Sequence, residues 1–173
     1  MEKETLGNVC SRKIQDKEIH RSRAGMDSDE DVLLTLSRCF FETFAVPTSQ
    51  SWMRCFDLAE RYFGADKGAI ICQRLLAALQ SVRYSRRSVF DFNASQCTGC
   101  CNILTEHERR LMAVIKSARR ERFGAVRMEL MMLCEGNNTA PSEESIANLC
   151  AALPSVAFAL TPSTKEEKNV PYS

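Results

Sequence analysis

Between residues 28 and 160, apolar residues recur three or four positions apart, which is the spacing of one face of a helix. Leu33, Leu36 and Phe40 show this pattern in its first stretch, which ends before Pro47. Because proline disfavours helical geometry in the residue before it, the first helix is expected to end there. Further helices are predicted over about 49–63, 66–87, 105–123, 128–134 and 142–153.

Helix-ending signals separate these stretches. Ser28 is expected to cap the first helix, and Gly64 is well placed to end the second in a left-handed conformation. Thr105 and Glu108 have the spacing of a capping box that starts the fourth helix. Residues 88–93 depart from the helical period, and their partly alternating side chains predict a short extended segment before a turn-rich loop. The chain is therefore expected to be all-α, an irregular or orthogonal bundle of about six helices.

The two ends of the chain lack this pattern. Residues 1–27 are polar and carry closely mixed charges, so they cannot bury enough apolar surface to offset the entropy of ordering. We expect them to be disordered, apart from a short helix within 13–21, and we expect the same disorder of 161–173. The chain is thus predicted to be one helical domain, 28–160, between two disordered ends.

Length and charge narrow the functional classes. The 173 residues fit one domain, and a net charge of +1 creates no overall field that would steer the chain towards nucleic acid or a membrane. The start of the chain lacks the apolar stretch of a secretory signal. No apolar run approaches the roughly 18 residues that span a bilayer. We therefore expect a cytoplasmic protein that contacts no membrane.

Nine cysteines are a high number for this length, and an odd one. Without a secretory signal, reduced thiols are expected rather than disulfides. Cys39, Cys55, Cys72 and Cys150 lie within the apolar helical stretches, where a free cysteine behaves as a small hydrophobic residue. These four cysteines are expected to belong to the core.

A denser group of cysteines lies in the loop Cys97-Thr98-Gly99-Cys100-Cys101. Two thiolates separated by two residues around a glycine-containing turn can bind one metal ion, as in zinc knuckles. His107 follows on the first turn of the predicted fourth helix, and Cys134 ends the fifth. If these helices pack as a hairpin, Cys97, Cys100, His107 and Cys134 form a tetrahedral zinc site, with Cys101 outside it.

Other interpretations of this loop stay open. Four thiolates, with Cys101 in place of His107, would suit an iron–sulfur cluster. Without metal, Cys97 and Cys100 are expected to be the most reactive thiols, because a nearby helix N-terminus stabilises thiolates. A pairing of Cys100 or Cys101 with His107, as nucleophile and base, would instead make an enzyme, although no third residue that orients the histidine is evident.

The segment Leu58-Ala59-Glu60-Arg61-Tyr62-Phe63-Gly64, followed by a predicted helix, resembles the helix-turn-helix of winged-helix bacterial repressors. The resemblance implies that the helix pair 49–83 binds DNA, with Lys67 and Arg74 on the recognition helix. This chain has one residue more before the glycine than that family's pattern. Such an insertion turns the next helix by about 100°. An ordinary helix hairpin that ends at Gly64 explains the same residues.

Basic residues on both sides of the cysteine loop suggest a second way to bind nucleic acid. Arg86 and Arg87 precede the loop, and Arg119 and Arg120 follow it. Such a group can bind phosphates without reading bases, so weak and salt-dependent binding is expected. A solvated helix face is the alternative.

The leading hypothesis is a small, non-enzymatic regulatory or adaptor protein of bacterial type whose cysteine loop binds zinc or senses redox state. A DNA-binding transcriptional regulator is the second hypothesis, and a cysteine-dependent enzyme is the third. The chain contains no glycine-rich phosphate loop, no serine elbow and no His-Glu-x-x-His sequence, which are the signatures of several large enzyme classes.

Overall fold

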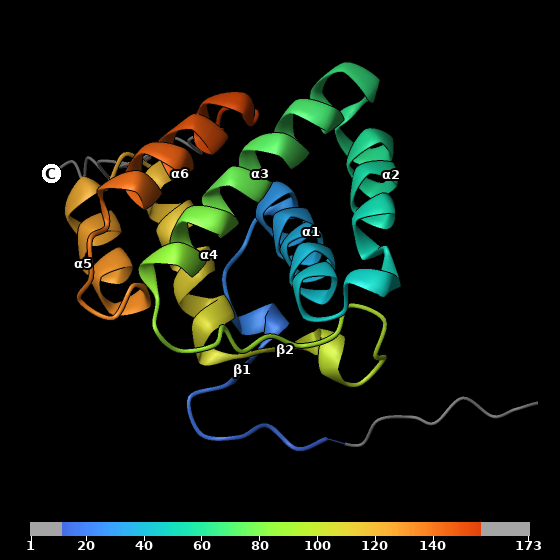
Figure 1. Ribbon diagram of the computed structural model, residues 1–173, viewed down its shortest axis with the longest axis horizontal. Helices are drawn as coiled ribbons and strands as arrows, with labels where there is room; N and C mark the ends of the chain where they lie inside the picture. The colour runs from blue at the N-terminus through green and yellow to red at the C-terminus, as the bar shows by residue number, and fades with distance from the viewer. Residues whose placement is uncertain (1–11, 157–173) are drawn as a thin grey trace, which may run out of the picture.

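The computed structural model describes residues 12–156 and is 68% helical, which confirms the all-α class (Figure 1). The described helices are α1 (Ser28–Ala45), α2 (Ser51–Phe63), α3 (Ala65–Ser85), α4 (Glu106–Arg119), α5 (Phe123–Leu133) and α6 (Ala140–Ala152). Three short 3-10 helices accompany them: η1 (Arg21–Arg23), η2 (Pro47–Ser49) and η3 (Cys100–Asn102). The predicted tail, 161–173, lies outside the described residues.

The helices cross one another instead of running side by side. In Figure 1, α1 is seen nearly end-on while α3 and α6 lie across the view, and α2 stands at one edge of the bundle. Helix α3 packs against α1, α2 and α6, and α4 packs against α5. This arrangement is the irregular bundle that the short connections predicted.

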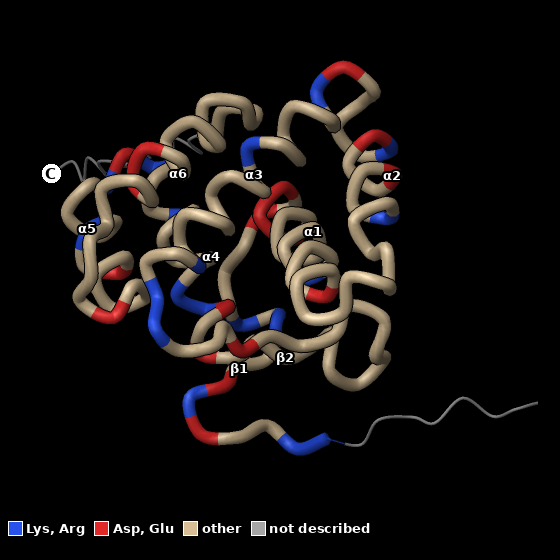
Figure 2. The backbone as a smooth tube through the Cα atoms, viewed as in Figure 1, with Lys and Arg blue, Asp and Glu red and all other residues tan. Residues whose placement is uncertain are grey.

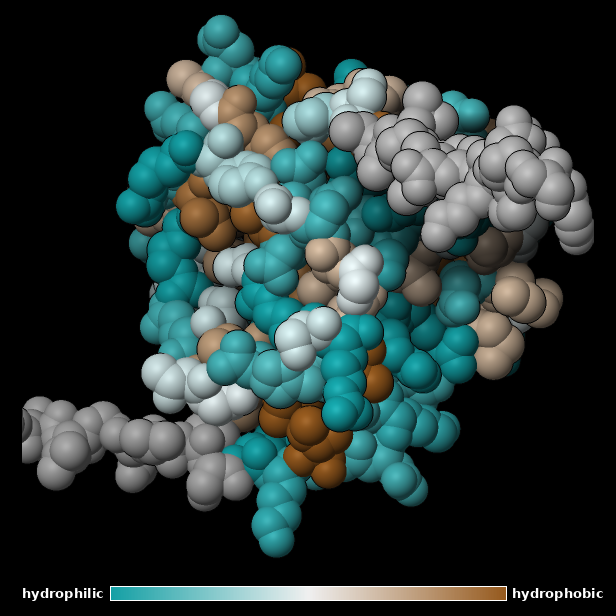
Figure 3. Space-filling view, turned by 180° about the vertical axis from the view of Figure 1, so that it is seen from behind, coloured by the Kyte–Doolittle hydropathy of each residue, from teal (hydrophilic) through white to brown (hydrophobic). Residues whose placement is uncertain are grey.

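The core lies where α1, α3 and α4 meet. Leu34, Leu75 and Leu111 are among its fully buried or almost fully buried side chains. Each such side chain contributes about 1.5–3 kcal/mol of hydrophobic free energy relative to its exposed state. On the face of the molecule turned away in Figure 1, hydrophobic residues form separate patches between hydrophilic ones (Figure 3). None of the helices in residues 12–156 is both long and apolar enough to cross a membrane.

Three of the four cysteines predicted to be core residues are buried. They are Cys39, Cys55 and Cys72, whereas Cys150 is half-buried. Cys55 on α2 and Cys72 on α3 face each other, with 3.6 Å between their sulfur atoms. Their hydrogen bond, followed by burial, raises the pKa of Cys55, so Cys55 disfavours the thiolate form.

The structure places residues 12–27 against the helices, where the sequence predicted disorder. Strand β1 (Ile19–His20) pairs antiparallel with β2 (Ile103–Leu104), and Ile19 lies opposite Leu104. The predicted short helix within 13–21 is replaced by β1 and the start of η1. The mixed charges that suggested disorder are paired: Arg21, for example, binds Asp31 through two nitrogen atoms.

Local predictions also need correction at three points. The extended segment predicted over 88–93 forms no strand, and Phe90 instead stacks on Phe41 with 4.1 Å between ring centroids. Helix α5 begins at Phe123, five residues before the start predicted for the fifth helix. Asp27, rather than Ser28, caps α1.

Candidate functional site

The cysteine loop is built on a buried ion pair between α1 and α4. Arg38 and Glu108 are both 1% exposed, and they meet through two parallel hydrogen bonds, 2.6 Å from Arg38 Nε to Glu108 Oε1 and 2.9 Å from Nη2 to Oε2. Such a bidentate contact fixes the orientation of both groups. The pair therefore provides a rigid base in the middle of the bundle.

The second half of the loop is attached directly to this base. Arg38 donates from Nη1 to the carbonyl oxygen of Cys101 (2.8 Å) and from Nη2 to that of Ile103 (2.6 Å). Asn93 ties the incoming chain to the same place, since its backbone N–H donates to Glu108 (3.1 Å) and its amide to Ile103 O (2.8 Å). The two ends of the loop are therefore joined to one ion pair.

Glu108 has a second function at the start of α4. The predicted capping box is confirmed: Glu108 N–H donates to Thr105 Oγ1 (3.1 Å), and Thr105 N–H donates to Glu108 Oε2 (2.9 Å). One carboxylate thus completes the helix cap and neutralises Arg38. In all of these contacts the side chain of Glu108 is the hydrogen-bond acceptor.

Glu42 and Arg54 hold the first half of the loop. Ser95 donates its backbone N–H to Glu42 Oε1 (2.7 Å), and Arg54 Nη2 lies 2.9 Å from Glu42 Oε2 and 3.0 Å from Ser95 Oγ. The loop is consequently anchored at both ends, to α1, α2 and α4. The three cysteines of the loop lie between these anchors.

The Cys-x2-Cys turn brings its first sulfur atom against its last amide. Cys100 N–H donates to Cys97 Sγ at 3.4 Å, and Cys101 N–H donates to the carbonyl oxygen of Cys97 at 2.8 Å. Cys101 points elsewhere, and its thiol donates to Thr98 O (3.4 Å). All three cysteines are half-buried. An amide that donates to sulfur favours the thiolate, which is the reactive form and the metal-binding form.

Arg12 supplies a positive charge to this turn. It makes a side-chain hydrogen bond with Cys100, and it also binds Asn93 and Glu18. Burial lowers the pKa of Arg12, but Glu18 and Cys100 more than offset this, and the pKa is raised overall. The attraction is mutual, so Arg12 favours a thiolate on Cys100.

Sequence reasoning missed both arginines. Arg38 carries a signal that could have been used: it lies four residues after Leu34 and three before Phe41, on the buried face of α1. A charged residue on such a face requires a buried partner. Arg12 carries no comparable signal, because it lies in a polar stretch of mixed charge.

The predicted ligands His107 and Cys134 are engaged elsewhere. His107 Nδ1 accepts from the backbone N–H of Asp91 (2.8 Å), and Nε2 lies 3.1 Å from Arg86 Nη2. Cys134 is fully buried beside Ser142, and burial raises its pKa. Across residues 12–156, no three His, Cys, Asp or Glu residues form a group that could hold a metal ion. The expected four-ligand set is thus not assembled in this part of the chain.

The environment of His107 predicts a pH effect on stability. Burial, followed by the charge of Arg86, lowers the pKa of His107 below its ordinary 6.5. The stabilising contribution of His107 is therefore complete above about pH 6.5, where its imidazole is neutral in the unfolded chain as well. This contribution is lost as the pH falls below that value. We expect the free energy of unfolding to fall between about pH 7.5 and 5, and His107→Gln to show a shallower fall.

Denaturant titrations of both proteins at several pH values would measure this difference. Glu135 does not obscure it, because hydrogen bonds from Ser88 and Arg87 lower its pKa to about 2 and keep it charged throughout. The other histidine, His20, is present in both proteins and does not affect the comparison. Equal slopes for the two proteins would show that His107 does not contribute.

Two of the predicted phosphate-binding arginines have buried side chains with acidic or carbonyl partners. Arg119 is 3% exposed and forms ion pairs with Asp27, Asp29 and Glu30 at the start of α1. Arg86 is 2% exposed and binds Glu135 and the carbonyl oxygen of Leu133. The charges of both side chains are thus already paired within the fold, and phosphate binding by Arg86 and Arg119 stays a prediction.

The other predicted nucleic-acid-binding residues differ in whether their side chains already have a partner within the fold. Arg120 pairs with Glu30, and Arg74 donates to the carbonyl oxygen of Asn148 on α6. Lys67 and Arg87 are exposed. The loop that follows α3 begins with a basic stretch in Figure 2, whereas basic and acidic residues are mixed along α2.

The helix pair that resembles a helix-turn-helix is a tightly packed hairpin in which Gly64 ends α2. Helix α3 lies between α2 and α6, so much of its surface is covered. Comparison of the chain with models of protein families, with curated proteins and with solved structures finds no match.

Proposed function

We propose that this chain is a non-enzymatic regulatory or adaptor protein whose loop Cys97–Cys101 responds to oxidants. The observation that carries the proposal is the hydrogen bond from Cys100 N–H to Cys97 Sγ, within a turn that Arg38 clamps. This bond draws the two ends of the Cys-x2-Cys turn together. Arg12 adds the positive charge that makes one of its thiols a nucleophile.

The proposed response is the oxidation of two thiols by a peroxide. The Cys100 thiolate attacks one oxygen of hydrogen peroxide, the O–O bond breaks, and the departing hydroxide takes a proton to leave as water. The sulfenic acid formed on Cys100 is then attacked by Cys97. An S–S bond forms, the S–O bond breaks, and the hydroxyl leaves with the Cys97 proton as a second water. Two thiols are oxidised, and one peroxide is reduced to two waters.

The loop is well placed to pass this change to the rest of the chain. It leads directly into η3 and β2, and β2 pairs with β1. Oxidation of Cys100 would also remove the thiolate that attracts Arg12. The surface formed by β1, β2 and the loop is therefore the part expected to differ between the reduced and oxidised states. A reducing compartment such as the cytoplasm would supply the reduced resting state.

One equivalent of hydrogen peroxide is expected to join Cys97 to Cys100, detected by peptide mass spectrometry as a loss of two hydrogens. Cys101→Ser should leave this reaction unchanged. Cys97→Ser should stop at a Cys100 sulfenic acid that dimedone can trap. The buried pair Cys55 and Cys72 is an internal control, because its sulfur atoms are only 3.6 Å apart but both residues are 0% exposed.

Faster oxidation of Cys55 and Cys72 than of the loop would contradict the proposal, because proximity rather than access and thiolate character would then control the reaction. A modification confined to Cys101 would contradict it as well. Reduced and oxidised proteins with identical hydrogen-exchange rates around β1 and β2 would leave the oxidation without a regulatory consequence.

Zinc binding is the second candidate, and the same amide-to-sulfur hydrogen bond favours it, because such bonds also stabilise metal-bound thiolates. Cys97 and Cys100 would supply two ligands. His107 and Cys134 would have to leave Asp91 and Ser142 to complete the predicted set. Equimolar zinc in the purified, reduced protein, lost in Cys97→Ser and Cys100→Ser but kept in Cys101→Ser, would favour this candidate over the redox one.

A further inference from the structure

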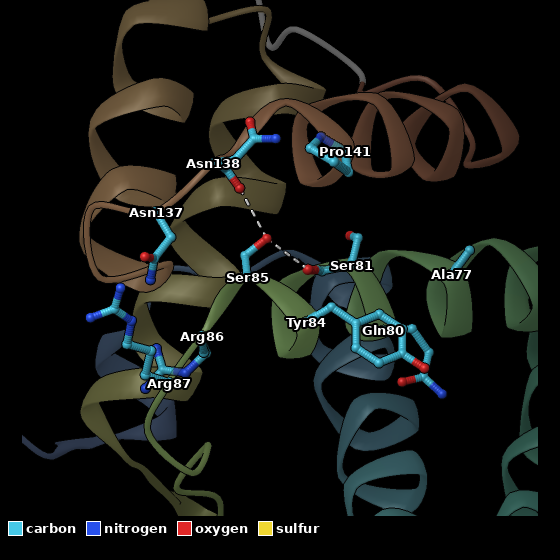
Figure 4. Close-up of a pocket in the computed structure, with 10 residues that line it drawn as sticks. All are labelled: Ala77, Gln80, Ser81, Tyr84, Ser85, Arg86, Arg87, Asn137, Asn138 and Pro141. Carbon is cyan, nitrogen blue, oxygen red and sulfur yellow. Dashed lines mark hydrogen bonds between the residues drawn. The ribbon is translucent and has the colours of Figure 1, made fainter.

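A groove lies between the end of α3 and the start of α6, on a side of the molecule that the cysteine chemistry does not use. Its volume is about 650 Å³, within the range of small-molecule sites. Figure 4 shows Gln80 and Tyr84 extending from α3 at one end, Arg87 and Asn137 at the other, and Pro141 of α6 above.

The walls of the groove are held together by Ser85. Its hydroxyl oxygen lies 3.0 Å from the carbonyl oxygen of Ser81, one turn back on α3, and 3.0 Å from that of Asn138 (Figure 4). This bridge joins the last turn of α3 to the chain that enters α6. The groove therefore has a defined width before any ligand binds.

Tyr84 offers an aromatic surface to the groove. Its side chain is among the most exposed large hydrophobic ones that the structure describes, at 84%. A ring in this position can stack on a planar ligand, and the favourable free energy of burying it is gained only when the ligand binds.

Arg87 offers a positive charge at the other end. Its backbone N–H donates to Glu135, but its guanidinium forms no ion pair with any residue of 12–156. The neighbouring Arg86 differs, since its side chain is 2% exposed and is paired with Glu135. The carboxylate of Glu135 is thus already neutralised by Arg86, so the guanidinium of Arg87 can attract an anion from solvent.

The two asparagines add hydrogen-bonding groups of both kinds. Asn137 donates one amide hydrogen to Cys134 O (2.9 Å), and Asn138 accepts from Ala140 N–H through Oδ1 (3.1 Å). Within the described residues, Asn137 Oδ1 and Asn138 Nδ2 have no hydrogen-bond partner. Figure 4 shows the two amides pointing in different directions, so they offer a separate acceptor and a separate donor rather than one paired contact.

We propose that this groove binds a nucleotide, with the base stacked on Tyr84 and the phosphate held by Arg87. An exposed ring at one end of the cavity and an arginine without an ion pair at the other match the base and the phosphate of that ligand. The nucleotide is either free or part of a single strand, because the recognised chemistry is the same in both. This inference is independent of the thiol chemistry proposed for the cysteine loop.

Fluorescence polarisation with a 5′-labelled ten-residue oligothymidylate, competed by AMP and by inorganic phosphate, tests the proposal. Tyr84→Ala is expected to weaken binding about 10-fold, within the range for loss of one stacked base. Tyr84→Phe should retain binding, because it keeps the ring. Arg87→Ala should weaken binding and reduce the slope of log affinity against log salt by about 1.

Lys67→Ala is the matched control, since it removes an equal charge from the exposed surface at the opposite end of α3. Displacement of the labelled strand by AMP would identify a free nucleotide, and binding of the strand alone would identify single-stranded nucleic acid. Equal effects of Lys67→Ala and Arg87→Ala, an unaffected Tyr84→Ala, displacement by phosphate as effective as by AMP, or no binding of either nucleotide probe would overturn the proposal.

Discussion

Replacing Glu108 with alanine is expected to lower the free energy of unfolding by about 3–5 kcal/mol, the range for breaking a buried ion pair from one side. Arg38 would remain 1% exposed with no carboxylate to neutralise it. The substitution also removes the acceptor for the backbone N–H groups of Thr105 and Asn93. Urea unfolding followed by circular dichroism measures the loss.

Asp57→Ala provides the matched control for this prediction. Asp57 pairs with Arg61 one turn later on α2, and the two side chains are 59% and 72% exposed. Such a surface pair contributes only about 0.3–0.5 kcal/mol. If Glu108→Ala cost no more than Asp57→Ala, the buried pair could not be the base on which the cysteine loop is built. A well-folded Glu108→Ala protein should also show faster alkylation of Cys97 and Cys100, because the loop loses its anchor.

Gly68→Ala is the second large effect, and its sign is the opposite of what helix propensity predicts. Alanine inside a helix is normally favoured over glycine by about 0.5–1 kcal/mol. At Gly68, however, a Cβ atom would lie 2.7 Å from Ala59 C and from Glu60 N, and 2.8 Å from Ala59 O. These are backbone atoms of α2 that cannot rotate away, so the two helices must separate. We expect a loss of about 1–3 kcal/mol, as for other overpacked sites.

Gly124→Ala is the control for Gly68→Ala. Gly124 also lies inside a helix, α5, but a Cβ atom there would meet no heavy atom within 4 Å. Alanine should therefore stabilise the protein at this site, by up to about 1 kcal/mol. Thermal or urea unfolding of the two variants should give shifts of opposite sign. A shift of the same sign in both would show that the contact between α2 and α3 is looser than described.

The close approach at Gly68 also bears on the resemblance to winged-helix repressors. The glycines of that segment serve the packing of α2 against α3, since Gly64 ends one helix and Gly68 admits the backbone of the other. A packing requirement is enough to account for both. DNA binding by this helix pair stays a prediction, to be tested with Lys67 and Arg74 replaced by alanine.

The sequence by itself determined the helical class and many of the helix ends. The period of Leu33, Leu36 and Phe40, the stop before Pro47, and the capping box of Thr105 and Glu108 all appear in the structure as predicted. These signals succeed because helix geometry and capping depend on residues within about four positions of each other, so neighbouring residues contain the information.

Only the tertiary structure decided which charges and thiols meet. Arg38 finds Glu108 seventy positions away, Arg119 pairs with Asp27 across ninety-two, and residues 12–27 are held in place by partners of this kind. In the described part of the chain, His107 contacts Arg86 and Asp91, and Cys134 contacts Ser142. Neither of them joins Cys97 and Cys100 within these residues. The physical reason is that ion pairs and metal sites depend on where whole helices pack, and that packing comes from the combined burial of many apolar side chains, which no short motif specifies.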